Sequence, residues 1–193
     1  TDVDGIYDTI KDMLSEYNEL IKTLDTAYNA ESAKGYEPLT DDEKESMSDD
    51  EVEKWETKIK DSLLRNDGTL SSVVSSMKNS MLAGITIDGK TYNLSDFGIS
   101  TGSYFSTSTN EKGVYHIDGD EDDSTSKGNT DKLKAAIAND SDTVIKFFSQ
   151  LANNLYSTLN KKLGTSNSMS SYMSIYNDKE MATQYSEYKT KIS

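Results

Sequence analysis

The first thirty residues carry apolar side chains in alternating steps of four and three residues. The residues in this series, here called the first seam, are Ile10, Leu14, Tyr17, Ile21, Leu24 and Tyr28. This is the heptad spacing of helices that pack along one another. Ile6, Met13 and Leu20 widen the stripe, as is typical of a helix inside a bundle. We therefore expect a helix over about residues 5–33, roughly 42 Å long, that needs a packing partner.

A second series of this kind lies at the other end of the chain. Its members, here called the last seam, are Met181, Tyr185, Tyr188 and Ile192. They belong to a helix expected over about residues 172–193. Because both seams have heptad spacing and lie at opposite ends of the chain, we expect them to pack against each other. The last helix has no C-terminal capping residue, so the natural chain is expected to continue beyond it. The chain begins at Thr1 without methionine or a leader, so it is expected to be either a processed chain or a piece of a longer one.

The sequence between the seams predicts further helices and a small β element. Helices are expected over residues 40–64, 69–83 and 131–163, the last divided near residue 140 into 131–139 and 141–163. Two capping boxes, Thr40–Glu43 and Ser48–Glu51, indicate helix starts within residues 40–64. After Gly84 the apolar period changes to two, and Asp88-Gly89 favours a hairpin turn. Residues 85–118 are therefore expected to form an inserted β element, with a third strand at 114–117, followed by an acidic loop at 118–130.

Together these elements predict a single, mainly α domain over residues 1–193, an antiparallel helical bundle or coiled coil with a small inserted β-hairpin element. Only 34% of the residues are hydrophobic, which favours narrow packing seams over one thick core. The net charge of -14 repels phosphate backbones and anionic lipid headgroups, so neither nucleic acid nor a membrane is an expected partner. The chain has no cysteine, which excludes disulfides and thiolate chemistry.

Residues suited to catalysis or metal binding are few. His116 is the only histidine and lies in the third expected strand. The acidic loop begins like a calcium loop at Asp118, but Asp123 and Asn129 replace the glycine and the bidentate glutamate that such a loop needs. No glycine-rich phosphate loop is present. We therefore expect no catalytic residue, no cofactor and no metal site.

The order of the elements resembles the C-terminal half of the bacterial flagellar filament cap family, hook-associated protein 2 (FliD). The segments that carry the resemblance are Tyr17–Ile21, Leu39–Ser48, Glu53–Glu56, Leu64–Leu70, Leu94–Gly102, Ile117-Asp118, Lys132–Ile137, Val144 and Phe147-Phe148. Their order and spacing cover nearly the whole chain. The stretch 119–129 lengthens a connection that is short in the family.

The resemblance implies an extracellular structural protein at the tip of the flagellar filament. Proteins of this family oligomerise as a ring and help incoming flagellin to fold and insert beneath them. The expected partners are therefore other copies of the protein, flagellin, the hook–filament junction proteins and an export chaperone. The absence of cysteine suits export as an unfolded chain. Some family members also adhere to mucin or host cells.

Two other functions stay open at this point. One is a secreted helical adhesin that binds glycan or a host protein without a role in the filament. The other is a hydrolase that uses His116. Binding of glycans by the chain would favour the first, and activity that depends on His116 would favour the second.

Overall fold

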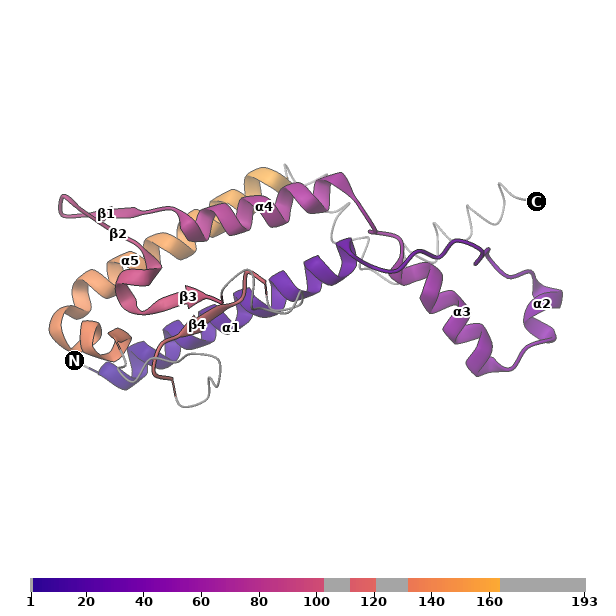
Figure 1. Ribbon diagram of the computed structural model, residues 1–193, viewed down its shortest axis with the longest axis horizontal. Helices are drawn as coiled ribbons and strands as arrows, with labels where there is room; N and C mark the ends of the chain where they lie inside the picture. Colours follow the sequence, from indigo (N-terminus) through magenta and orange to yellow (C-terminus); the bar gives the residue numbers. More distant parts are fainter. Residues whose placement is uncertain (1, 103–111, 121–131, 164–193) are drawn as a thin grey trace. The chain divides into compact units, whose positions relative to one another are not determined.

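The computed structural model describes residues 2–102, 112–120 and 132–163. It is mainly α, with small antiparallel sheets, which confirms the fold class expected from the sequence (Figure 1). Its contacts group into two compact units. The first comprises Thr1–Thr26 and Ser72–Leu159, and the second comprises Ala27–Ser71 and Asn160–Ser193. That the two units form the single domain expected over residues 1–193 stays a prediction.

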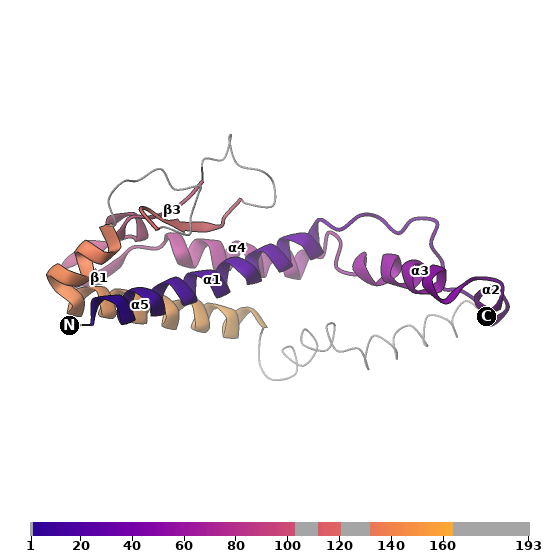
Figure 2. The same ribbon diagram turned by 90° about the horizontal axis from the view of Figure 1, so that it is seen from below.

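The first unit is built on three helices. They are α1 (Val3–Tyr28), α4 (Gly68–Leu82) and α5 (Lys132–Leu163), each of which lies mostly within this unit (Figures 1 and 2). Lys78 of α4 forms an ion pair with Asp25, late in α1. Met81, about one turn further along α4, lines the same apolar cavity as Met13, which lies earlier in α1. Residues further along α4 therefore approach residues earlier in α1. These two helices are antiparallel, as Figure 1 shows.

The first helix ends at Tyr28, five residues before the expected end at residue 33. The Tyr28 carbonyl accepts a hydrogen bond from the Asn66 amide at 3.0 Å. The Ala30 carbonyl accepts another from Arg65 Nη1 at 2.5 Å. The last carbonyl of the helix and one just beyond it are thus bonded to a distant segment, which no local pattern near Gly35 or Pro38 indicates.

The β element forms two separate two-stranded sheets instead of one continuous element. The hairpin of β1 (Ile85–Ile87) and β2 (Lys90–Tyr92) has the expected register, with Ile87 opposite Lys90. Its turn residues Asp88 and Gly89 have φ of 50° and 84°, as a type I′ turn requires. The third expected strand, β4 (Tyr115–Ile117), pairs with β3 (Ile99–Thr101) and not with the hairpin. A 3-10 helix, η1 (Leu94–Phe97), separates β2 from β3.

The core of the first unit lies where the three helices meet these strands. Its largest fully buried side chains are Phe147, Ile21, Met77, Ile99, Leu133, Ile137, Leu151 and Val144. The ring of Phe97 lies 4.8 Å from that of Phe147 and 5.7 Å from that of Phe148. Each large apolar side chain buried in this way contributes about 1.5–3 kcal/mol. The α-helical bundle and the strands therefore share one core in this unit.

The division expected near residue 140 is present within α5. Asp140 has φ of -152° and ψ of 78°, which are not helical angles. Its carboxylate accepts a hydrogen bond from the Thr143 amide at 3.1 Å. Asp140 thus caps a second helix that follows the first almost without a connection. The same contact holds the pKa of Asp140 below its usual value, because the hydroxyl and the amide of Thr143 both stabilise the carboxylate.

The second unit contains α2 (Asp41–Glu45) and α3 (Asp49–Asp61). The region expected to be helical over residues 40–64 is thus two helices, the second ending at Asp61. Both capping boxes are present, since the amides of Thr40 and Ser48 donate to Glu43 and Glu51 at 2.8 and 2.9 Å. No residue of α2 or α3 is fully buried. These two helices consequently depend on their caps more than on a core of their own.

Candidate interaction surfaces

The structure places most of the first seam inside the core of the first unit. Ile10, Leu14, Tyr17 and Ile21 are between 0% and 4% exposed, whereas Leu24 and Tyr28 are half-buried. The last seam, Met181 to Ile192, lies outside the described residues. The expected pairing of the two seams therefore stays a prediction.

Polar side chains of α1 bind the segment that contains β4. The Asn18 amide group donates to the Tyr115 carbonyl at 2.9 Å, and its oxygen accepts from the Tyr115 amide at 2.8 Å. Nearer the start of α1, Tyr7 Oη donates to Asp120 at 2.9 Å and Lys11 Nζ forms an ion pair with it at 3.0 Å. The Asp120 side chain is only 5% exposed, so these two donors supply the partners that a buried carboxylate requires. Four side chains thus fix the register of β4 on α1.

Tyr17 adds an aromatic contact to this attachment but has an unsatisfied hydroxyl group. Its ring meets that of Tyr115 edge to face, with centroids 5.7 Å apart. Its Oη is buried and has no hydrogen-bond partner among the described residues. Burial raises the pKa of Tyr17 well above its usual value, with smaller contributions from Tyr115 and Asp25. The hydroxyl therefore stays protonated and costs stability where it lies.

The three helices of the first unit line a small apolar cavity that is partly open to solvent. Its volume is about 170 Å³, and it is lined by Met13, Tyr17, Met81, Leu151, Ala152, Leu155, Tyr156 and Leu159. Tyr156 is 68% exposed. Leu82, Ile145 and Leu20 of the same unit are also exposed, at 70%, 45% and 41%. Several large apolar side chains thus lie at the surface of this unit.

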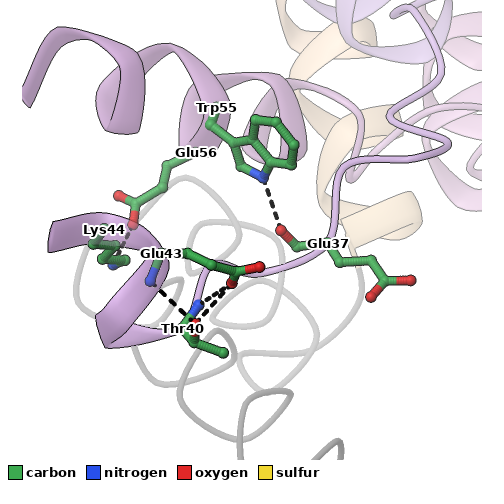
Figure 3. A network of polar contacts seen from close by, with 6 residues as sticks. All are labelled: Glu37, Thr40, Glu43, Lys44, Trp55 and Glu56. Atoms are coloured by element: carbon green, nitrogen blue, oxygen red, sulfur yellow. Dashed lines mark hydrogen bonds and ion pairs between the residues drawn. The ribbon is translucent and has the colours of Figure 1, made fainter. Parts of the chain in front are cut away.

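The second unit presents an acidic surface with an aromatic pair. Between Asp41 and Asp61 the chain has ten acidic residues and four lysines. The rings of Tyr36 and Trp55 lie 4.6 Å apart, and Trp55 Nε1 donates to the Glu37 carbonyl at 2.8 Å. Figure 3 shows this bond beside the ion pair of Lys44 and Glu56, which joins α2 to α3.

The residues considered for chemistry are not brought together by the fold. His116 lies in β4 opposite Ser100 and is half-buried. Of the acidic loop at 118–130, Asp118 to Asp120 are described, and Asp120 is bound to Tyr7 and Lys11. In the described ranges, no group of His, Asp or Glu side chains is arranged to hold a metal ion. Within the same ranges, no helix has the length and apolar character needed to cross a membrane.

Sequence reasoning missed the polar residues that attach β4 to α1. Asn18 and Lys11 occupy polar positions beside the first seam, where the pattern indicates only solvent exposure. Asp120 belongs to the stretch 118–130, which the sequence predicts to be a solvated acidic loop. Their partners are 97 to 113 residues away in the chain, so no local pattern identifies these pairs.

The fold defines the class as a mainly α protein with two small antiparallel sheets. The chain belongs to the family described as flagellar hook-associated protein 2 C-terminus, which matches residues 1–193. It is 26% identical over 166 residues to the flagellar hook-associated protein 2 of Halalkalibacterium halodurans. That match covers 86% of this chain and 28% of the relative, so the chain spans little more than a quarter of the relative's length. No solved structure matches the chain significantly.

Proposed function

We propose that this chain is part of the structural cap at the distal end of the bacterial flagellar filament. The observation that carries the proposal is membership of the hook-associated protein 2 family over all 193 residues. The mainly α fold and the absence of cysteine are compatible with a protein that is exported unfolded and folds at the filament tip. Its location is then extracellular, on the flagellum.

In this role the chain is a scaffold and not an enzyme. Its partners are other copies of the cap protein in a ring, flagellin subunits that polymerise beneath the cap, and the hook–filament junction proteins. An export chaperone is a further partner before secretion. Leu82 and Tyr156 of the first unit are exposed and therefore accessible to such partners.

The test is electron microscopy of cells that lack the gene, together with an immunoblot of the medium for flagellin. A cap protein predicts cells without filaments and flagellin monomers in the medium. Complementation with the parent gene should restore the filaments. Normal filaments in the deletion strain, with loss of adhesion alone, would contradict the cap function and favour the adhesin alternative, which no present observation supports.

A further inference from the structure

Residues 29–48, here called the strap, contact α3 at several points but have little structure of their own. The part 29–40 forms neither helix nor strand, and α2 is the only helix within the strap. Leu39, at 4% exposure, is the one buried residue in the range 29–48. A segment with so few buried apolar contacts is expected to open locally at a much lower free energy than a core element.

The centre of the strap is attached to α3 through Trp55. The Trp55 Nε1 group donates to the Glu37 carbonyl at 2.8 Å, as Figure 3 shows. The centroid of the Tyr36 ring lies 4.6 Å from that of the Trp55 ring, and Tyr36 is 39% exposed. The attachment lies at the surface of the second unit, so it can break without disturbing a core.

Two ion pairs attach the strap before and after this contact in chain order. Glu31 pairs with Lys58, and Lys44 pairs with Glu56 at 2.5 Å. The Glu31 side chain is 85% exposed and the Glu56 side chain is 39% exposed. Ion pairs that are open to water in this way each contribute little to stability. The strap is therefore held by a few weak contacts that solvent can reach.

Both ends of the strap are fixed to neighbouring parts of the second unit. At its start, the Ala30 carbonyl accepts a hydrogen bond from Arg65 Nη1 at 2.5 Å. At its end, Ser48 is the N-cap residue of α3, and its hydroxyl accepts a hydrogen bond from the Glu51 amide at 3.4 Å. Opening is consequently confined to the middle of the strap, between these two fixed points.

The strap and α3 carry net charges of the same sign. The strap has six acidic residues and two lysines, a net charge of -4, and α3 has six acidic residues and three lysines, a net charge of -3. This acidic excess favours separation of the two. The pairs formed by Lys44 and Lys58 are the attractive charges that oppose it. We infer that the strap opens and closes on α3 while the first unit stays folded, with Lys44 and Lys58 holding it closed and Trp55 uncovered when it opens.

The indole N–H of Trp55 measures this opening directly. Trp55 is the only tryptophan, so its indole gives a single, distinct NMR signal, and exchange of its hydrogen with solvent requires the bond to Glu37 to break. In the 193-residue chain, the protection factor at this group should be at least about a hundredfold lower than at the amide of Ile21, a buried residue of α1. Equal protection at the two groups would show that the strap opens only with global unfolding, and would overturn the inference.

Reversing one charge tests whether the ion pairs hold the strap closed. Lys58→Glu removes a pair and adds a like charge, so the Trp55 indole should exchange about two- to fivefold faster. Adding Glu31→Lys to this variant restores the pair with its charges exchanged, and the rate should return to near that of the parent. The Ile21 amide should keep its exchange rate throughout.

Lys54→Glu is the matched control for the charge reversal. Lys54 is exposed on the same helix, and within the described part of the chain it forms no ion pair with the strap. Its replacement should leave the exchange of the Trp55 indole nearly unchanged. Equal acceleration by Lys54→Glu and Lys58→Glu, or no recovery in the charge-exchanged double variant, would contradict the role of the ion pairs.

Discussion

Replacing Ile21 with alanine tests whether the first seam supports the core of the first unit. Ile21 is 0% exposed and lies on α1 among the most deeply buried side chains of that unit. Removing its side chain beyond Cβ loses the transfer free energy of three carbons and leaves a cavity, for which about 2–5 kcal/mol is typical. Because domains of 100–200 residues shift by about 2–8 °C per kcal/mol, the melting temperature should fall by at least about 4 °C.

The assay is thermal unfolding followed by circular dichroism, with Leu20→Ala as the control. Leu20 precedes Ile21 on the same helix but is 41% exposed, so its replacement should change stability by less than about 1 kcal/mol. Ile21→Asp should lower the melting temperature further than Ile21→Ala, because it buries an unpaired charge. If Ile21→Ala has the same melting temperature as the parent, or if both alanine variants lose the same stability, the first seam is not part of the core.

Three further predictions concern polar groups. Asn18→Ala removes both hydrogen bonds to the Tyr115 backbone and should lower the free energy of unfolding in urea by about 1–3 kcal/mol. An unchanged urea midpoint would refute the attachment of β4 to α1. Tyr17→Phe removes a buried hydroxyl without a partner and should raise the urea midpoint or leave it unchanged; a clear decrease would show that the hydroxyl has a stabilising partner. Glu51 has a pKa below its usual value of 4.5, because the backbone amide and the hydroxyl of Ser48 bind its carboxylate. Its stabilising effect is therefore present above that value and is lost as the pH falls through the lowered pKa, so helicity should decrease on acidification, and less so in Glu51→Gln.

The features that the sequence predicted well depend on residues close together in the chain. The Asp88-Gly89 turn, the capping boxes that begin at Thr40 and Ser48, and the break at Asp140 each arise from groups within three or four residues. In each of them a side chain or a glycine satisfies a local backbone requirement. Such signals are present in the sequence whatever the rest of the fold does.

The features that the sequence did not predict depend on distant partners. Helix α1 ends at Tyr28 because Asn66 bonds to its last carbonyl, and β4 pairs with β3 while Asn18 binds its backbone. The heptad pattern identified Ile10, Leu14, Tyr17 and Ile21 as packing residues but could not identify what they pack against. In the first unit that partner includes Tyr115 of β4 and the residues of α4 and α5 that line the apolar cavity with Tyr17. A periodic pattern shows which face of a helix is buried and leaves the partner undetermined.

Exposed apolar side chains likewise leave their partner undetermined. Leu82 and Tyr156 are about 70% exposed although helices α4 and α5 also carry well-buried residues. Apolar residues scattered singly on a surface are ordinary, and only a contiguous patch marks an interaction site. Membership of the flagellar family therefore carries the cap function proposed here.

The location of the protein on the filament tests the cap function most directly. A cysteine introduced at the exposed residue Ser95 can be labelled on living cells with a maleimide dye, because the 193-residue chain has no cysteine of its own. The unmodified parent strain measures background labelling. The cap function predicts one fluorescent focus at the distal end of each filament. Label along the filament shaft, or only on the cell body, would contradict it.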